Sequence, residues 1–518
     1  MKANCFWSAP MRGQKKLRLT ELVKESAKVM DPTALQETEI CGLAVDSRKV
    51  APGFLFAALP GTRTDGRAFI DQAVAQGAVA ILAPPGTALK SYDRPVRLVT
   101  DENPRRRLAL MAAAFYGRQP ATVAAVTGTN GKTSAASFTR QIWQGLGRTA
   151  ASLGTLGLSP PRADAPQSLT TPDPIELHRC LAALADDGVE CLVMEASSHG
   201  LDQYRLDGVR VTAAAFTNLT RDHLDYHGGM AAYGQAKLRL FGELLAADGT
   251  AVINADAPFG DEVHAVCRRR KIRTITYGVA ESDLCLMGQE PTEHGQRLLL
   301  DVFGRASAVD LPLAGTFQAA NVLTALGLAI ATGADPRKAV ATLGALEGVS
   351  GRLELVARSK RGGQIYVDYA HTPDALETVL AALRPHTRAQ LSVVFGCGGD
   401  RDRGKRPLMG EIANRLADRA IVTDDNPRSE DAAAIRREIL AAAPNAQEIA
   451  DRGEAIAKAV AALGPGDVLI IAGKGHESGQ IVGDRVHPFV DRDVARAAVA
   501  GKAPSKQKTG KRSRRGAR

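Results

Sequence analysis

Short apolar runs alternate with amphipathic, helix-like stretches along most of the chain, which is the pattern of parallel strands joined by crossover helices. Between about 119 and 350 the apolar runs are VECLVMEASS, TAAAFTNL, TAVINAD and RTITYG. Between about 351 and 500 they are GQIYVDYA, LSVVFGCGG, RAIVTDD and VLIIAGKG, and their ends are rich in charge. Both blocks therefore predict α/β domains, the second one similar to a dinucleotide-binding fold.

A smaller module precedes these two blocks. It has strand-like segments in GLAVDSR and FLFAAL, followed by a helix and a strand in RAFIDQAVAQGAVAILAP. The fold class predicted for the whole chain is thus α/β with three domains: a small N-terminal module, a central phosphate-loop domain with a parallel sheet, and a Rossmann-like C-terminal domain. The expected boundaries are 1–17 for an N-terminal extension, 18–118, 119–350 and 351–500 for the domains, and 501–518 for a basic tail.

The composition is that of a soluble globular chain, with 45% hydrophobic and 24% charged residues. The stretch 313–334 is long enough to suggest a membrane span, but Gln318, Asn321 and several Thr and Gly predict a buried core helix instead. The first residues contain no apolar segment of a secretory signal, and we expect none. Seven unclustered cysteines favour reduced thiols in a cytoplasm over disulfides or a zinc site.

The net charge of +10 is concentrated at the C-terminus, since residues 501–518 hold four Lys and four Arg and no acid. Eight of the ten net charges therefore belong to this tail, which we interpret as a solvated extension. Contact of the tail with RNA or an anionic lipid is the alternative. We expect no nucleic-acid partner, no stable membrane insertion and a monomer.

The turn TGTNGKTS follows the apolar run Val123–Val126 and leads into a helix-like segment. Backbone N–H groups in such a turn converge on an anion at the helix N-terminus. Lys132 can neutralise phosphate charge, and the Thr133 hydroxyl can ligate Mg²⁺. Val126 stands where the usual phosphate loop has its first glycine, so this is a tightened variant. A glycine turn with a solvated lysine is the alternative.

Acidic and imidazole side chains follow two of the central apolar runs. Glu195 ends the strand-like VECLVME, where a carboxylate can hold Mg²⁺. TNLTRDHLDYHG comes after the next strand and offers His223, Asp225 and His227. A zinc site there is possible on residue type alone, but no thiolate is nearby and the phosphate loop favours a role with Mg²⁺ and nucleotide.

The motifs TGTNGKTS, EASSHGL, TNLTRDHLDYHG, GRLE, DYAHTPDA and DNPR occur in one order along the chain. Together they resemble the Mur ligase family over about residues 20–500, and most closely those members that add meso-diaminopimelate to UDP-N-acetylmuramoyl-L-alanyl-D-glutamate. The resemblance implies a cytoplasmic enzyme that uses ATP and Mg²⁺. It forms an amide through an acyl phosphate on the D-glutamyl carboxylate.

The resemblance also implies roles for individual residues. The expected ATP site consists of Gly128, Thr129, Asn130, Gly131, Lys132, Thr133, Ser134, Asn321, Arg352 and Asp368. The expected magnesium site consists of Thr133, Glu195, His223 and Lys237, with Lys237 carbamylated to N6-carboxylysine, and the catalytic groups are Lys132, Glu195, His223 and Lys237. Taken alone, Lys237 is typical of an exposed helix position.

Substrate contacts follow in the same way. For the uridine diphosphate they are Val45, Ser47, Thr62, Arg63 and Thr64; for the muramoyl-dipeptide, Thr170, Thr171, Ser197, Gln203 and Arg205; for diaminopimelate, Arg401, Asp425, Asn426, Pro427, Arg428, Gly473 and Glu477. Folylpolyglutamate synthetase, which has a similar phosphate loop, is the nearest alternative enzyme, and the DNPR run and the N-terminal module argue against it. A phosphate-loop protein that binds nucleic acid through its tail is the alternative from another class.

Overall fold

The computed structural model of the chain describes residues 16–23, 28–29, 37–61, 64–163, 165–166, 169–292 and 295–502. Thr62 and Arg63, and nearly all of the expected N-terminal extension and basic tail, lie outside these residues. The chain divides into two units. Unit 1 runs to Cys285 and includes Val302–Gly304 and Ala320–Thr342; unit 2 comprises Leu286–Asp301, Arg305–Ala319 and the chain from Leu343 onward.

The N-terminal part of unit 1 contains a five-stranded sheet of order β2-β7-β6-β5-β4. The strands are β2 (Lys28–Val29), β4 (Gly42–Ala44), β5 (Phe54–Ala57), β6 (Ala80–Ala83) and β7 (Arg97–Thr100). Leu55 and Leu82 pack with Leu108 and Met111 of helix α4 (Pro104–Tyr116), while α3 (Ile70–Ala75) contributes to a second cluster. The predicted small α/β module is therefore present.

The central part of unit 1 contains a sheet whose strands follow the order β10-β9-β11-β8-β12-β13-β14. The bounds are β8 (Thr122–Thr127), β9 (Ala150–Gly154), β10 (Gly157–Ser159), β11 (Cys191–Glu195), β12 (Val211–Phe216), β13 (Leu245–Asn254) and β14 (Arg273–Gly278). All neighbours from β9 to β14 are parallel. Because β8 lies between β11 and β12, the loop after β8 is flanked by the ends of both strands.

Helices surround this sheet in unit 1. They are α5 (Lys132–Gly145), α6 (Pro174–Asp186), α7 (Ser198–Asp202), α8 (Leu224–His227), α9 (Met230–Arg239), α10 (Gly260–Arg269), α11 (Phe317–Ala331, which begins in unit 2) and α12 (Pro336–Ala341). The stretch 313–334 forms the buried helix α11, as predicted. Within the described part of the chain, no helix is long and apolar enough to cross a membrane.

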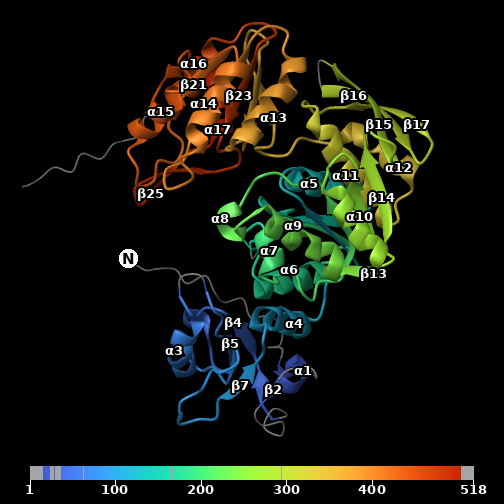
Figure 1. Cartoon of the computed structure of the whole chain (residues 1–518), viewed down its shortest axis with the longest axis vertical. Helices are drawn as coiled ribbons and strands as arrows, with labels where there is room; N and C mark the ends of the chain where they lie inside the picture. The colour runs from blue at the N-terminus through green and yellow to red at the C-terminus, as the bar shows by residue number, and fades with distance from the viewer. Residues whose placement is uncertain are drawn as a thin grey trace, which may run out of the picture. The chain divides into compact units, whose positions relative to one another are not determined.

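Unit 2 contains a six-stranded sheet of order β18-β19-β23-β20-β21-β22. The strands are β18 (Glu354–Arg358), β19 (Gln364–Asp368), β20 (Leu391–Phe395), β21 (Arg419–Val422), β22 (Gln447–Glu448) and β23 (Val468–Ala472). Alternate residues of β23 face two cores: Ile470 packs with α13 (Pro373–Leu383), α14 (Lys405–Leu416) and α15 (Ala432–Leu440), whereas Leu469 and Ile471 pack with α16 (Arg452–Ala461) and α17 (Asp491–Val499). Helices on both faces of a mainly parallel sheet agree with the predicted Rossmann-like domain (Figure 1).

Several antiparallel strands were not predicted from the sequence. They are β10 beside β9 in unit 1, β16 (Gly295–Val302) with β17 (Ala306–Leu311) in unit 2, and the hairpin β24 (Gly479–Val482) with β25 (Arg485–Pro488). β15 (Leu284–Thr292) also escaped prediction. Burial varies along β15 and β17, which carry Glu290 and Asp310, so these two lack the continuous buried run that marks a strand of a covered parallel sheet.

Candidate active site

The turn between β8 and α5 has a backbone that only glycine adopts readily. Gly128 has φ 147° and Gly131 has φ 86°. A Cβ atom on Gly128 would collide with Thr217 Oγ1, and one on Gly131 would collide with Asn321 Oδ1. The glycines therefore allow the turn to approach the end of β12 and to place Asn321 of α11, which is 7% exposed, against the start of α5.

Hydrogen bonds attach this turn to the residues that follow β12. Thr129 N–H donates to Asn218 O at 2.9 Å, and Asn130 N–H donates to Asn218 Oδ1 at 2.9 Å. Thr217 Oγ1 donates to Asn130 O at 2.6 Å. These contacts hold the loop backbone in place, with Lys132, Thr133 and Ser134 in the first turn of α5.

Two lysines contact the same carbonyl of the turn. Lys132 Nζ donates to Gly128 O at 2.9 Å, and Lys237 Nζ of α9 donates to that oxygen at 2.7 Å. Lys237 is 1% exposed and lies 4.3 Å above the ring centroid of Tyr233. Burial holds the pKa of Lys237 well below its usual value, and the charge of Lys132 lowers that pKa further. Lys237 is thus a buried neighbour of the phosphate loop and not an exposed helix residue.

Glu195 ends β11 beside the start of the loop, in register with Val126 of β8. Its side chain is 2% exposed, and its carboxylate accepts from Thr155 N–H at 2.8 Å and from Thr155 Oγ1 at 3.1 Å. A Cβ on Gly154 would collide with this carboxylate. The carboxylate of Glu195 and the buried hydroxyl of Thr133 are both hard oxygen donors, the chemistry that Mg²⁺ prefers.

Three imidazoles gather near the loop. His199 lies 4.8 Å from His223 and 5.5 Å from His227, measured between ring centroids. Burial, with smaller contributions from these two neighbours, lowers the pKa of His199 to about 4. His223 has φ 53° and is about half exposed. The described residues contain no group of three or more His, Cys, Asp or Glu side chains placed to hold a metal ion.

The five residues expected at the muramoyl-dipeptide form one connected set. Thr171 Oγ1 donates to Glu195 O at 2.8 Å and accepts from Ser197 N–H and Oγ, both at 3.0 Å. Arg205 donates to Thr171 O at 2.8 Å and to Gln203 Oε1 at 2.7 Å. Thr170 Oγ1 lies 3.1 Å from Thr155 Oγ1. The set adjoins Glu195 and therefore the phosphate loop.

Of the residues expected at the uridine diphosphate, Val45 and Ser47 lie just after β4 and Thr64 follows β5. Ser47 is buried and donates to Gln72 Oε1 at 2.8 Å, whereas Val45 is 41% exposed. Thr64 is exposed and accepts from Gly61 N–H at 3.2 Å. Thr62 and Arg63 lie outside the described residues. The described geometry therefore covers part of this expected subsite.

Unit 2 carries two further residues of the expected ATP site. Asp368 ends β19, is 7% exposed, and accepts from Leu353 N–H at 2.6 Å and Ala370 N–H at 2.7 Å. Burial raises the pKa of Asp368, although the charge of Arg352 acts in the opposite direction. The guanidinium of Arg352 lies 4.7 Å above the ring centroid of Tyr369. Asp368 thus fixes the backbone that carries Arg352.

The expected amino-acid pocket lies at the ends of β21 and β23. Arg428 has φ 52°, and its backbone pairs with β24: its N–H donates to Ile481 O at 3.1 Å and its carbonyl accepts from Gly483 N–H at 2.8 Å. Its guanidinium donates to Gly399 O at 2.8 Å. Asp425, Asn426 and Pro427 before it are buried, and Arg401 is exposed. The pocket therefore presents a half-buried guanidinium from a constrained turn.

The loop after β23 lies against the same residues. Gly473 has φ 114°, and a Cβ there would lie 2.8 Å from Asp425 Oδ2. Asn426 Nδ2 donates to Glu477 Oε2 at 2.9 Å. The predicted residues Asp425, Asn426, Gly473 and Glu477 are thus in contact with one another.

Sequence reasoning missed three residues that organise these sites. Tyr233 hydroxyl lies 3.1 Å from Thr129 Oγ1, and Asn218 binds the loop backbone as described. Lys474 contacts both Asn426 and Glu477. Asn218 stands within the motif TNLTRDHLDYHG, and Lys474 lies at the end of the apolar run VLIIAGKG, so these positions were the available signal, whereas nothing marked Tyr233.

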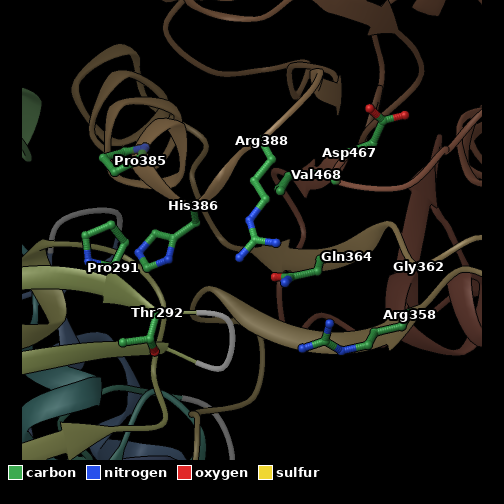
Figure 2. Close-up of a pocket in the computed structure, with 11 residues that line it drawn as sticks. Pro291, Thr292, Arg358, Gly362, Gln364, Pro385, His386, Arg388, Asp467 and Val468 are labelled. Atoms are coloured by element: carbon green, nitrogen blue, oxygen red, sulfur yellow. The ribbon is translucent and has the colours of Figure 1, made fainter.

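A separate cavity of about 180 Å³ lies in unit 2. Its lining includes Gln364 and Val468, the first residues of β19 and β23, whereas Asp368 and Gly473 lie at the opposite ends of those strands. Figure 2 shows the Arg388 guanidinium pointing toward Gln364 within it. Position at the carboxyl ends of the strands, rather than cavity shape, therefore identifies the candidate site.

Comparison with known families gives three matches in chain order. The family described as "Mur ligase family, catalytic domain" matches residues 39–116, "Mur ligase middle domain" matches 126–329, and "Mur ligase, glutamate ligase domain" matches 351–475. A protein of Caulobacter vibrioides is 56% identical over 468 residues, covering 89% of this chain and 96% of the relative. One of Bradyrhizobium diazoefficiens is 52% identical over 494 residues, covering 94% and 100%. Both are named UDP-N-acetylmuramoyl-L-alanyl-D-glutamate–2,6-diaminopimelate ligase.

Solved structures agree with these matches. A structure titled with the same ligase name is 33% identical, with a TM-score of 0.69 over 94% of this chain and 99% of its own. MurF from Acinetobacter baumannii is 19% identical, with a TM-score of 0.62 over 88% and 94%. Folylpolyglutamate synthase from Mycobacterium tuberculosis, at 21% identity, has a TM-score of 0.59 over 77% and 96%. The last two are similar to this chain in fold.

Proposed function

Because the chain belongs to the Mur ligase family, we propose that it joins meso-diaminopimelate to UDP-N-acetylmuramoyl-L-alanyl-D-glutamate, using ATP and releasing ADP and phosphate. The observation that carries the proposal is the identity of 51–56% to relatives that bear this ligase name. Folylpolyglutamate synthase shares the fold at 21% identity only. We assign residues 18–118 to the nucleotide-sugar, 119–350 to ATP and 351–500 to the amino acid.

The first chemical step activates a carboxylate. An oxygen of the substrate's D-glutamyl carboxylate attacks the γ-phosphorus of ATP, the bond from that phosphorus to the bridging oxygen breaks, and ADP leaves. The product is an acyl phosphate, whose phosphate is a good leaving group. Lys132 and the backbone N–H groups at the start of α5 offset the negative charge on the transferring group, which is the main contribution of a protein to phosphoryl transfer.

Mg²⁺ fits the oxygen donors of the site. When bound, it neutralises charge on the phosphate oxygens. We propose that Thr133 and Glu195 hold it, together with His223 and the carbamate of Lys237. The carbamate forms when the Lys237 amine attacks CO₂ and loses a proton, which converts a buried amine into an anion. Support comes from the burial of Lys237 and its contact with Gly128 O next to the cation Lys132.

The second step forms the amide. An amine of diaminopimelate attacks the acyl carbon, the carbon–oxygen bond to phosphate breaks, and the amine loses a proton. In this proposal the linked residues Thr171, Ser197 and Arg205 hold the dipeptide end of the acceptor. The residues from Asp425 to Arg428, with Glu477, hold the amino acid.

The finer assignments are part of the same proposal. We propose that the enzyme acts as a monomer in the cytoplasm, where ATP is available. The cysteines among the described residues are all free thiols, which suits a reducing compartment.

A phosphate-release assay tests the proposed function. The purified chain is mixed with ATP, Mg²⁺ and UDP-N-acetylmuramoyl-L-alanyl-D-glutamate, and phosphate is measured with meso-diaminopimelate, with L-lysine and with no amino acid. We expect fast release with diaminopimelate only, and a nucleotide-tripeptide product by mass spectrometry. Equal release in all three mixtures, or no tripeptide, would contradict the proposal.

A further inference from the structure

The loop after β23 passes close to its neighbours on both sides of Lys474. A Cβ on Gly473 would lie 2.8 Å from Asp425 Oδ2, and one on Gly475 would lie 2.8 Å from Tyr369 Cβ. Both glycines also have positive φ, 114° and 53°. The backbone on each side is therefore too close to other residues for a larger side chain. Lys474 lies between these two contacts, and its side chain is fully buried.

Lys474 makes two polar contacts in this buried position. Its Nζ donates to Asn426 Oδ1 at 3.0 Å and to Glu477 Oε2 at 3.0 Å. Asn426 Nδ2 donates to the same Glu477 oxygen at 2.9 Å, and Ile481 N–H donates to Asn426 Oδ1 at 2.9 Å. The three side chains form a closed set in which both ends of the Asn426 amide have partners of the correct type.

This set determines which oxygen of Glu477 faces outward. Oε2 accepts from both Asn426 and Lys474, whereas no hydrogen bond from a described residue reaches Oε1. The Glu477 side chain is 33% exposed, so a ligand can reach it. The Lys474 ammonium has no exposed surface and cannot itself touch a ligand. Any effect of Lys474 on binding must therefore act through Glu477 and Asn426.

We infer that Lys474 is a positioning residue for the amino-acid substrate: it holds Glu477 and Asn426 so that the free carboxylate oxygen of Glu477 receives an ammonium group of that substrate. The inference rests on the proposed function, because it takes the amino-acid pocket to be the one described above. A buried ammonium bound to one carboxylate oxygen fixes the rotamer of Glu477. Without the ammonium, the carboxylate turns toward solvent and Asn426 loses one of its two donors.

The test compares Lys474→Met with wild type in steady-state kinetics, varying each of the three substrates in turn. Met matches the length of the side chain without its charge or its hydrogen bonds. We expect KM for diaminopimelate to rise roughly thirtyfold or more, as when one partner of a buried charge pair is removed. We expect KM for ATP and for the nucleotide substrate, and kcat, to change by less than about threefold. Lys458→Met, at an exposed position of α16 in the same unit, is the matched control and should behave as wild type.

A second measurement separates positioning from a structural role. In a Glu477→Gln background, Lys474→Met should raise KM for diaminopimelate by less than about threefold more, because the carboxylate charge through which Lys474 acts on the substrate is already gone. Lys474→Gln, which keeps a donor without the charge, replaces Lys474→Met if thermal unfolding shows that the Met variant does not fold. The inference is wrong if the KM values for all three substrates rise together, or if only kcat falls. It is also wrong if the effects of Lys474→Met and Glu477→Gln on KM for diaminopimelate are additive. If wild type itself does not use diaminopimelate, the proposed function fails instead.

Discussion

Lys132 and Lys237 donate hydrogen bonds to the same backbone oxygen, that of Gly128, at 2.9 and 2.7 Å. Two ammonium groups so close repel each other, and Lys237 is also almost fully removed from water. Both effects lower the pKa of Lys237 and shift it toward the neutral amine. A neutral amine is the form that attacks CO₂, and the resulting carbamate would replace repulsion of Lys132 by attraction. The shared oxygen thus links the phosphate loop to the proposed modification.

The first prediction concerns Lys132. Lys132→Ala should reduce kcat/KM by about 10³-fold or more, because the cation acts on charge that develops during phosphoryl transfer. The thermal unfolding temperature of Lys132→Ala should stay close to that of wild type, because Lys237 still donates to Gly128 O. The phosphate-release assay measures the loss, with Lys458→Ala as the exposed control. Near-normal turnover of Lys132→Ala would contradict the phosphate-loop assignment.

The second prediction concerns the carbamate. Lys237→Ala should be nearly inactive, and added formate or acetate should restore part of its activity by supplying a carboxylate where the carbamate stands. Lys237→Met should be equally inactive but should not respond to formate, because its side chain fills the space. Activity is measured over a range of formate concentrations. A fully active alanine variant, or equal rescue of both variants, argues against a carbamate.

Much of this fold follows from patterns within short segments. Buried parallel strands such as β11 and β23 are nearly continuous apolar runs, and the two glycines of the phosphate loop mark its turn. Residues whose environment comes from distant parts of the chain were harder to predict. Lys474 stands between two glycines and is typical of a solvated turn in isolation; it is buried because Asp425, Tyr369 and Gly351 surround its loop. Lys237 was placed beside the phosphate loop by family resemblance, because nothing in YGQAKLRLF predicts its burial.

The third prediction concerns acid stability. His178 of α6 is buried with its Nε2 3.0 Å from Asp207 O, and burial lowers the pKa of His178 to about 4. In the unfolded chain this pKa is near 6.5, so between these values the unfolded state binds the proton and the native state does not. His178 therefore has almost no effect on the free energy of unfolding above pH 6.5, and it lowers that free energy as the pH drops from 6.5 toward 4. The loss is about 2 kcal/mol at pH 5.

Urea unfolding at pH 7 and pH 5 checks this prediction in wild type and His178→Gln. Glutamine cannot be protonated. Between pH 7 and pH 5 the free energy of unfolding of His178→Gln should therefore decrease by about 2 kcal/mol less than that of wild type. His264→Gln, an exposed position on α10, is the control and should follow wild type. The same decrease in wild type and His178→Gln would show that His178 is not the group responsible.

The fourth prediction concerns the choice of amino acid. Diaminopimelate differs from lysine chiefly by a carboxylate at its far end, so a selective site needs a cation there. Arg428 supplies a half-buried guanidinium, and hydrogen bonds with Ile481 and Gly483 hold the Arg428 backbone. A guanidinium can bind a carboxylate through two parallel hydrogen bonds, which an ammonium cannot reproduce. Loss of that pair costs about 2–5 kcal/mol when it is buried, or roughly thirty- to several-thousand-fold in kcat/KM.

The measurement is kcat/KM for diaminopimelate and for lysine in wild type, Arg428→Ala and Arg428→Lys. Arg, Lys and Ala all carry a Cβ at this position of φ 52°, so we expect differences between the variants to report the rest of the side chain. Selectivity should fall mainly through loss of diaminopimelate use, and Arg428→Lys should recover only part of it because the charge returns without the paired geometry. Removing the guanidinium should also relieve its repulsion of the lysine ammonium, so use of lysine should rise slightly. Arg437→Ala, at an exposed site on α15, should leave both values unchanged. If the ratio of the two values stays the same in Arg428→Ala, another residue distinguishes diaminopimelate from lysine.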